Sequence, residues 1–443
     1  MADYLKGAGL AERGLVVGYD TRFASEDFAA AVAGVVAANG IKVYLTTHAT
    51  PTPVVSYGVL AKKAGAGVVI TASHNAGQWN GFKIKDKNGS SAADKITSAV
   101  VANIGKAYNS GTVKLVSLDE AIKQELVVET DLSAIYFDQV TSVVDIERLR
   151  NAGLELVIDP MYGAGAGYLA GLLEGGSTKF TEIHGERNPL FPGIRPEPIM
   201  PHLGELAAAV KKNRASVGLA TDGDADRMGI VDETGKFITQ LQVFALLALY
   251  LLEVRGERGP IVKTLTASSM IDRLGELYNV PVHETAVGFK YVAPVMIREN
   301  AIMGGEESGG YGFRGHVIER DGILANLYFL DLMVSTGKSC SRLVEYLYSK
   351  VGPHHYQRVD VEFPEAQRQT IISRVRDNAP GTIDGVRVAG VNTADGFKFI
   401  LEDNTWLLIR FSGTEPLLRI YTETESPERV EKLLKIGREI AGV

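Results

Sequence analysis

The fold is decided by the stretch Leu15–Arg22 (LVVGYDTR), in which a short apolar run ends in a polar triplet. The apolar run predicts a buried strand. A helix should follow from Ser25, which can act as its N-cap, and should end before Gly40. Apolar strands separated by amphipathic helices predict a mostly parallel α/β sheet. The next expected elements are strands over residues 41–45 and 68–71 and a helix over residues 53–63.

The same alternation of strands and helices begins again twice. A strand over residues 154–159 precedes three alternate glycines and a helix, and a strand over residues 216–220 leads into an acidic loop. A third α/β segment begins near Phe237. Its expected elements are a helix over residues 241–255, a strand over residues 260–263 and a loop over residues 304–315. Three similar segments indicate an internal repeat, although the sequence has no fixed period.

The C-terminal part of the chain has a different pattern. Strands over residues 405–411 and 417–423 flank a tight loop, and a helix begins at Ser426-Pro427. Ser is a favoured N-cap and Pro a favoured first helical residue, so this part predicts a smaller α+β domain. A chain of 443 residues is too long for one core. We expect three similar α/β domains with mixed sheets and one C-terminal α+β domain, with bounds at 1–133, 134–236, 237–350 and 351–443.

The composition is that of a globular enzyme with a mildly acidic surface. Hydrophobic residues make up 45% of the chain and charged residues 22%, which is typical of folded proteins. The 46 basic and 53 acidic residues give a formal charge of −7. This charge gives no reason to expect nucleic acid or an anionic membrane as a partner. An anionic substrate would need locally clustered Arg, Lys and backbone N–H groups.

Cysteine use and hydropathy indicate where the protein works. Cys340 is the only cysteine, so no intrachain disulfide can form, which fits a reducing compartment. The N-terminus has no apolar signal segment. The longest strongly apolar stretch, residues 244–254, is far shorter than the ~20 residues that cross a bilayer. We therefore expect a soluble, cytoplasmic protein without a membrane partner.

Four loops carry residues suited to chemistry, and the first is Thr71-Ala72-Ser73-His74-Asn75. Ligands of open α/β sheets bind outside the carboxyl ends of strands, so Ser73 is well placed after the predicted strand. A plain strand-to-loop turn is the alternative, because serine is common in loops. The loop lacks the Gly-x-Ser-x-Gly motif of hydrolases, and His74 cannot easily act as a base from the next position.

The second loop, Asp222-Gly223-Asp224-Ala225-Asp226-Arg227, also follows an apolar strand. Three carboxylates at alternate positions can converge on one hard cation such as Mg²⁺, and without a cation they would repel one another. An EF-hand loop is the competing metal site, because Glu233 falls at its twelfth position. However, Arg227 stands where that loop requires Gly, and a strand rather than a helix precedes it. We therefore favour a magnesium site.

The third loop, residues 304–310, has glycines on both sides of Glu306 and Ser308. At extended spacing these two side chains point the same way, and glycine lets the backbone approach a ligand closely. Carboxylate and hydroxyl oxygens suit neighbouring sugar hydroxyls. A flexible glycine-rich turn is the alternative.

The fourth loop, residues 410–416, lies between two predicted strands. Arg410, two hydroxyl groups and the backbone N–H groups near Gly413 can cradle a phosphate. Arg419, on the following strand, could reach the same phosphate. A plain hairpin turn is the alternative.

The four loops in this order resemble the α-D-phosphohexomutases, the phosphoglucomutase/phosphomannomutase family, over essentially the whole chain. The motifs at residues 71–75, 222–227 and 410–416 are together highly specific. The resemblance implies four domains around a central cleft, to which each contributes one loop. It also implies a mutase that interconverts hexose 1-phosphate and 6-phosphate through a phosphoserine and a 1,6-bisphosphate. Glucose is the expected hexose, with mannose second, and the expected assembly is a monomer or a homodimer.

The resemblance also implies roles for individual residues. Ser73 would be the phosphoserine, and a hexose 1,6-bisphosphate would act as activator. The implied ligands of one Mg²⁺ are Ser73, Asp222, Asp224 and Asp226. The other implied catalytic residues are His74, Lys83 and Arg227. The implied substrate-binding residues are Lys290, Glu306, Ser308, His316 and Arg320 in the third domain and Arg410, Ser412, Gly413, Thr414 and Arg419 in the fourth.

Two features differ from the family pattern. Family members usually begin with a strand and a Gly-Thr-Ser/Asp-Gly-x-Arg loop, whose arginine contacts the transferring phosphate, before a helix that resembles residues 1–6. That segment is absent here, so a catalytically silent sugar-phosphate-binding protein is one alternative. Ala76 stands where the first loop usually continues with Pro.

Phosphoglucosamine mutase is the other alternative function. However, Glu306-Glu307-Ser308 resembles the glucose-type enzymes, and Phe82-Lys83 favours the glucose/mannose group.

Overall fold

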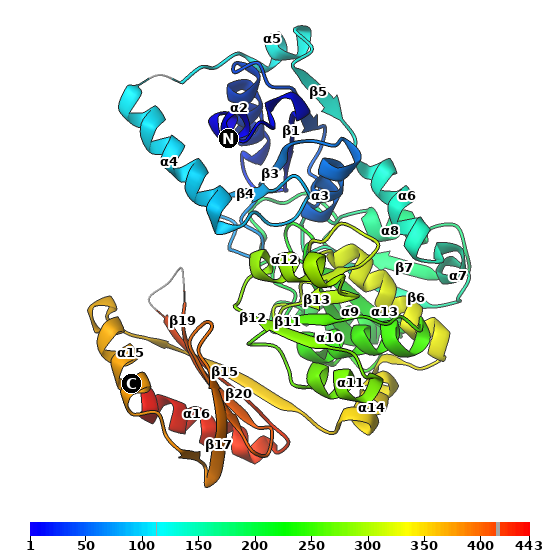
Figure 1. Ribbon diagram of the computed structural model, residues 1–443. Helices are drawn as coiled ribbons and strands as arrows, with labels where there is room; N and C mark the ends of the chain where they lie inside the picture. Colours follow the sequence, from blue (N-terminus) through cyan, green and yellow to red (C-terminus); the bar gives the residue numbers. More distant parts are fainter. Residues whose placement is uncertain (112, 413–416) are drawn as a thin grey trace.

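The chain folds into three α/β domains followed by a C-terminal domain with an antiparallel sheet (Figure 1). The structure is a computed structural model, and it describes residues 1–111, 113–412 and 417–443. No helix in this described part is long and apolar enough to cross a bilayer. The predicted fold class is therefore confirmed.

The first domain is built on a five-stranded sheet in the order β4-β3-β1-β2-β5. Its strands are β1 (Leu15–Tyr19), β2 (Val43–Thr46), β3 (Ala66–Ile70), β4 (Phe82–Lys85) and β5 (Val127–Thr130). Its helices are α1 (Ala2–Gly7), the 3₁₀ helix η1 (Ala11–Arg13), α2 (Ser25–Ala37), α3 (Thr52–Ala61), α4 (Asp94–Ser110) and α5 (Leu118–Lys123). Only β4 runs antiparallel to its neighbour. β3 is apolar throughout because Val68 packs in the core with α2 and Val69 in the core with α3.

One predicted detail is wrong at the start of α2. Ser25 is the first helical residue, and Ala24 holds the cap position with φ of +56°. The Ser25 hydroxyl instead donates a 3.0 Å hydrogen bond to Asp20 Oδ1, beyond the end of β1. A hydrogen bond to a charged carboxylate is stronger than one between neutral groups. The Ser25 hydroxyl therefore stabilises the turn after β1 and does not cap the helix.

The second domain has a five-stranded mixed sheet in the order β10-β9-β8-β6-β7. Its strands are β6 (Glu155–Asp159), β7 (Lys179–Glu182), β8 (Val217–Thr221), β9 (Met228–Asp232) and β10 (Phe237–Ile238). Its helices are α6 (Ser133–Val143), α7 (Ile146–Arg150), α8 (Tyr168–Leu173) and α9 (Gly204–Asn213). β8 and β9 form an antiparallel pair, and the acidic loop joins them.

The third domain has a four-stranded sheet in the order β12-β11-β13-β14. Its strands are β11 (Ile261–Thr264), β12 (Val282–Thr285), β13 (Met303–Gly305) and β14 (Tyr311–Phe313). Its helices are α10 (Gln240–Leu249) with a π-helical turn η2 (Tyr250–Val254), α11 (Met270–Tyr278), α12 (Phe289–Glu299), α13 (Gly322–Thr336) and α14 (Cys340–Val351). α10 and α13 are apolar on nearly all sides because they lie in one continuous core that joins the first three domains.

The C-terminal domain has a six-stranded antiparallel sheet in the order β15-β20-β19-β18-β17-β16. Its strands are β15 (His355–Glu362), β16 (Thr382–Ile383), β17 (Val386–Asn392), β18 (Phe397–Leu401), β19 (Trp406–Phe411) and β20 (Leu417–Thr424). Its helices are η3 (Glu365–Gln367), α15 (Arg368–Asp377) and α16 (Pro427–Ala441). One sheet face packs on α15 and α16 as a separate core. The other face meets the third domain, where Glu284 accepts hydrogen bonds from Lys398 (2.5 Å) and Asn392 (2.7 Å).

Candidate active site

The loop after β3 presents Ser73 on a strained backbone. Its φ is +53°, in the left-handed region that residues with side chains rarely adopt. The Ser73 N–H donates to Thr71 Oγ1 at 2.8 Å, and the buried Arg22 guanidinium donates to the carbonyl oxygens of Ser73 (2.6 Å) and Asn75 (2.7 Å). These bonds leave the Ser73 hydroxyl directed at Asp222 Oδ2, to which it donates at 2.8 Å.

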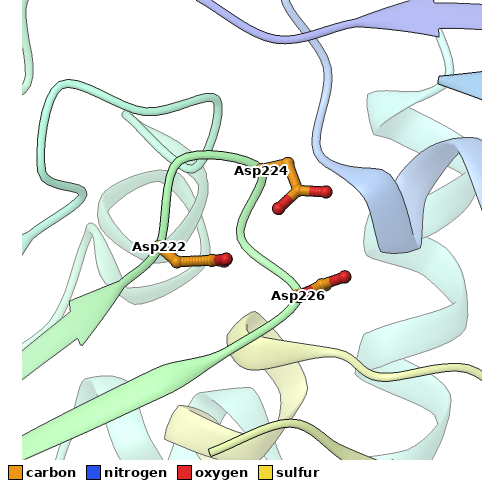
Figure 2. Close-up of side chains that lie close together, drawn as sticks. All are labelled: Asp222, Asp224 and Asp226. Carbon is orange, nitrogen blue, oxygen red and sulfur yellow. The ribbon is translucent and has the colours of Figure 1, made fainter. Parts of the chain in front are cut away.

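The loop between β8 and β9 brings three aspartates to this serine, and Figure 2 shows their side chains projecting from it. Asp222, Asp224 and Asp226 are fully buried, and one oxygen from each lies within 4.8 Å of the others. A Cβ at Gly223 would lie 2.5 Å from the Ser73 carbonyl oxygen. Glycine therefore lets the two loops approach this closely.

The three carboxyl groups have different electrostatic surroundings. Burial raises the pKa of Asp222 well above its ordinary range, and the charges of Asp224 and Asp226 act in the same direction. Burial also opposes ionisation of Asp226, but the Arg320 guanidinium and the Lys83 ammonium outweigh it and hold the pKa of Asp226 below its ordinary value. At Asp222, the carboxyl group that faces Ser73, the nearby cations therefore do not outweigh burial and the other two carboxylates.

Two buried oxygens of this loop, Asp224 Oδ1 and Asp226 Oδ1, have no hydrogen-bond partner among residues 1–111, 113–412 and 417–443. Buried polar atoms are nearly always paired, and a divalent cation would satisfy both oxygens. Carboxylate oxygens are the ligands that Mg²⁺ prefers in proteins. The residues present therefore fit a magnesium ion.

Lys83 connects the first domain to the acidic loop. Its Nζ lies 2.5 Å from Asp224 Oδ2 and 2.9 Å from Asp226 Oδ2. Although burial acts against its charge, the two carboxylates raise the pKa of Lys83 above its ordinary value. Lys83 is therefore a fixed cation against the acidic loop.

His74 and Arg227 complete the set of predicted catalytic residues. The backbone N–H of Arg227 donates to Asp222 Oδ1 at 3.1 Å. The side-chain Nε of Arg227 lies 3.9 Å from Asp226 Oδ1. The Arg227 charge, followed by burial, lowers the pKa of His74 to about 2. The His74 imidazole is therefore neutral in this structure.

The third predicted loop joins the site through Arg320. Arg320 Nη1 lies 3.2 Å from Glu306 Oε2, and its Nη2 lies 2.7 Å from Asp226 Oδ2. A Cβ at Gly310 would lie 2.3 Å from Arg320 Cδ, so this glycine leaves room for the arginine. Burial raises the pKa of Glu306, while the Arg320 charge acts in the opposite direction. Ser308 lies half-buried in the same loop.

Lys290 and His316 have other partners in this structure. Lys290 Nζ, on α12, lies 2.6 Å from Asp94 Oδ1 at the start of α4. The buried His316 ring stacks on Tyr57 with a centroid distance of 5.7 Å, and its Nε2 lies 2.9 Å from Asp321 Oδ2. Within the described ranges, neither side chain hydrogen-bonds to the loop of Ser73 or to the loop of the aspartates.

The fourth predicted loop, residues 410–416, begins at the end of β19. Arg410 and Arg419 occupy paired positions on these strands, so their side chains leave the same sheet face. Arg410 Nε lies 2.8 Å from Asp395 Oδ2, and the Ser412 N–H donates to the Leu417 carbonyl oxygen at 2.8 Å. Gly413 and Thr414 lie outside the described residues.

The prediction missed two residues that touch the site, Arg22 and Thr52. Arg22 holds the Ser73 loop, as described above. The Thr52 N–H donates to the Asp224 carbonyl oxygen at 2.8 Å, and its hydroxyl donates to Asp224 Oδ2. Their positions in the sequence could have indicated them, because Arg22 follows β1 and Thr52 follows β2, just as Ser73 follows β3.

Comparison with known proteins identifies the family. Four family models of phosphoglucomutase/phosphomannomutase match in order: α/β/α domain I at residues 1–110, domain II at 134–235, domain III at 240–351 and the C-terminal domain at 371–437. A phosphoglucomutase/phosphomannomutase of Thermococcus kodakarensis is 31% identical over 98% of this chain and 91% of its own length. The chain belongs to the phosphoglucomutase/phosphomannomutase family.

Other members of the family differ in their stated substrates. A phosphoglucosamine/phosphogalactosamine mutase of Sulfurisphaera tokodaii is 30% identical over 95% of this chain and 89% of its own length. A crystal structure from Thermus thermophilus, provisionally described as a phosphomannomutase, has a TM-score of 0.83 and 34% identity, covering 100% of this chain and 93% of that one. The phosphoglucomutase/phosphomannomutase fold thus extends over the whole chain.

Proposed function

We propose that this chain is a phosphohexomutase that interconverts hexose 1-phosphates and hexose 6-phosphates, with glucose preferred and mannose accepted. The observation that carries the proposal is the 2.8 Å hydrogen bond from the Ser73 hydroxyl to the buried Asp222. A serine beside a candidate metal loop and fixed cations is the arrangement that phosphoryl transfer needs, because that reaction depends on positioning and neutralisation of charge. In this proposal, Ser73 carries a phosphoryl group between turnovers.

The proposed ligands of one Mg²⁺ are phosphorylated Ser73, Asp222, Asp224 and Asp226. When bound, the ion neutralises negative charge on the transferring phosphoryl group. The chain's own cations act beside it. Lys83 and Arg320 bond Asp226 from two different domains, and Arg227 belongs to the loop itself. Together they limit where the phosphoryl oxygens can lie.

The first half-reaction transfers the phosphoryl group from Ser73 to the 6-hydroxyl of a hexose 1-phosphate. The bond between phosphorus and Ser73 Oγ breaks, a bond between phosphorus and the sugar oxygen forms, and the hydroxyl proton is transferred, in net terms, to Ser73 Oγ. The product is a hexose 1,6-bisphosphate. After this intermediate turns end for end, its 1-phosphate returns to Ser73 and leaves hexose 6-phosphate.

In both half-reactions, protein residues must bind the end of the sugar that does not react. Glu306 and Ser308 would bind the sugar hydroxyls. The residues that would hold the other phosphate are Arg410, Ser412, Gly413, Thr414 and Arg419. Lys290 and His316 would assist only if they left their present partners, Asp94 and Asp321.

A coupled assay tests the proposal with glucose, mannose and glucosamine 1-phosphates, Mg²⁺ and catalytic glucose 1,6-bisphosphate. We expect the highest kcat/KM with glucose 1-phosphate and the next highest with mannose 1-phosphate. The relative named for glucosamine and galactosamine phosphates makes glucosamine 1-phosphate the necessary third substrate. A higher kcat/KM with it would reassign the substrate. No turnover of any of the three would overturn the proposal and favour a sugar-phosphate-binding protein.

Arg410→Ala tests the phosphate cradle. If Arg410 holds the non-reacting phosphate, its loss should remove roughly the 1.5–3 kcal/mol of a charged hydrogen bond, so we expect KM for hexose phosphates to rise by about 10- to 150-fold. Turnover should fall as well, because remote binding energy aligns the reacting hydroxyl. Steady-state kinetics and a melting curve measure both effects.

Arg429→Ala is the matched control for this variant. Arg429 lies in the same domain and bonds Asp384 and Asp403, so its loss should lower Tm and leave the kinetics normal. If Arg410→Ala behaves in the same way, Arg410 belongs to an ordinary hairpin and the cradle is wrong.

A further inference from the structure

A buried ion pair behind the active site has no part in the proposed reaction. Lys85 and Glu319 are both fully buried, and Lys85 Nζ lies 2.6 Å from Glu319 Oε2. Ser91 Oγ donates to the same oxygen at 2.6 Å. Lys85 ends β4 in the first domain, whereas Glu319 belongs to the third domain. The pair therefore joins two domains that both contribute to the site.

Lys85 is placed by the same strand as Lys83. Residues two apart on a strand face the same side of the sheet, so both lysines project from β4 together. Lys83 reaches Asp224 and Asp226, and Lys85 reaches Glu319. Any movement of β4 that broke one of these contacts would therefore disturb the other.

Glu319 in turn holds Arg320. Its Oε1 accepts the Arg320 backbone N–H at 2.9 Å and lies 3.5 Å from Arg320 Nε. The Nε contact is an ion pair and not a hydrogen bond, because Arg320 Nε has no hydrogen-bond partner among the described residues. The guanidinium group is a planar, rigid fork, so the attraction of Glu319 for Nε influences the direction of both terminal nitrogens. Those nitrogens face Glu306 at 3.2 Å and Asp226 at 2.7 Å.

Stability alone does not account for this pair. Burying two charges has a large desolvation cost, and replacement of a buried ion pair by apolar side chains is often neutral or stabilising. What an apolar pair could not supply is an acceptor for the backbone N–H of Arg320 and a carboxylate beside its Nε. Glu319 contacts Arg320 at its backbone N–H and Nε, whereas Glu306 and Asp226 contact its terminal nitrogens.

We propose that Lys85 and Glu319 are positioning residues that aim the Arg320 guanidinium at Glu306 and Asp226. Through Arg320 they thereby fix the distance between the loop that carries Glu306 and the acidic loop that carries Asp226. This inference rests on the proposed phosphohexomutase function. Neither residue touches reacting atoms, and both act through Arg320.

Two double variants separate positioning from stability. Lys85→Met/Glu319→Met replaces the pair by apolar side chains and should keep Tm near the wild-type value, while kcat falls by about 10- to 100-fold because Arg320 is no longer aimed. Glu319→Gln leaves one carbonyl oxygen for three donors, Lys85, Ser91 and the Arg320 backbone N–H, so its kcat should fall similarly. Lys85→Met/Glu319→Gln removes the charged competitor for that oxygen, which Arg320 then shares only with Ser91, and should recover much of the lost kcat.

Lys263→Met is the matched control, because Lys263 is also buried and pairs with Asp272 and Glu284 in the third domain. It should lower Tm and change kcat by less than about 2-fold. Wild-type kcat in Lys85→Met/Glu319→Met would overturn the inference. If that variant does not fold, failure of Lys85→Met to raise the kcat of Glu319→Gln overturns it instead.

Crystal structures of the same variants distinguish failure of this inference from failure of the proposed function. If the wild-type protein does not turn over hexose phosphates, the proposed function fails but the inference about Arg320 is unaffected. In that event the guanidinium of Arg320 should still leave Glu306 and Asp226 in Lys85→Met/Glu319→Met and in Glu319→Gln. An unmoved guanidinium in the variants that fold would overturn the inference.

Discussion

Ser73→Ala is expected to lower the turnover of hexose 1-phosphates by about 10⁴-fold or more, because it removes the atom that carries the phosphoryl group in the proposed mechanism. The carbonyl oxygens of the loop keep their bonds to Arg22, so Tm should stay close to the wild-type value. Intact-mass spectra should show a fraction of wild-type protein with one added phosphoryl group. Peptide spectra should place that group on Ser73, and the variant should lack it.

Ser56→Ala is the control for this experiment. Ser56 is a buried serine of α3 in the same domain, so its variant should keep wild-type turnover and the phosphoryl group on Ser73. Full turnover by Ser73→Ala, or phosphate found only on another residue, would remove Ser73 from the mechanism.

Asp224→Asn is expected to lower kcat by roughly 10²- to 10³-fold with a much smaller change in KM. In the proposed mechanism the carboxylate helps to hold a cation that acts on charge developing during transfer, and such interactions contribute several kcal/mol. Titration calorimetry should show weaker Mg²⁺ binding to the variant. Lys83 keeps its contact with Asp226 in this variant, so the remaining cations of the site stay in place.

Asp232→Asn provides the matched comparison for Asp224→Asn. Asp232 is a buried aspartate at the end of β9, and its Oδ1 accepts hydrogen bonds from the N–H groups of Thr234 and Lys236. Its variant should lose stability but retain both kcat and Mg²⁺ affinity. An unchanged kcat in Asp224→Asn at saturating Mg²⁺ would refute the metal site.

The fold was predictable where burial is simple and unpredictable where polar groups compete. β3 could be predicted because its side chains are buried on both faces and apolar throughout. β15 was missed because HYQRVDVE contains only three apolar residues and none of its side chains is buried, so the alternation that marks a half-buried strand is weak there. The predicted helix over residues 241–255 is α10 followed by a π-helical turn, and hydrophobic periodicity does not distinguish these two forms in a segment buried on all sides.

The candidate site was predictable to the extent that its residues follow buried strands in recognisable order. Ser73 and the three aspartates could be placed by that rule, and the structure brings them together. The supporting residues could not be identified in this way. Thr52 lies 172 positions from Asp224, and Lys85 lies 234 positions from Glu319. Such pairs depend on how the domains pack, which local patterns do not report. The roles given to the substrate-binding residues remain predictions.

The placement of Arg320 has a consequence for the protein while it is being synthesised. The ribosome produces Lys83 and the acidic loop before Arg320, which lies 94 positions after Asp226. A nascent chain that has completed only its first two domains therefore has Lys83 and Arg227, without the later Arg320, near Asp224 and Asp226. Domains generally fold as units during synthesis, so this acidic centre is electrostatically incomplete until the third domain has docked. The candidate active site is thus completed by the assembly of three domains and not by the folding of any one of them.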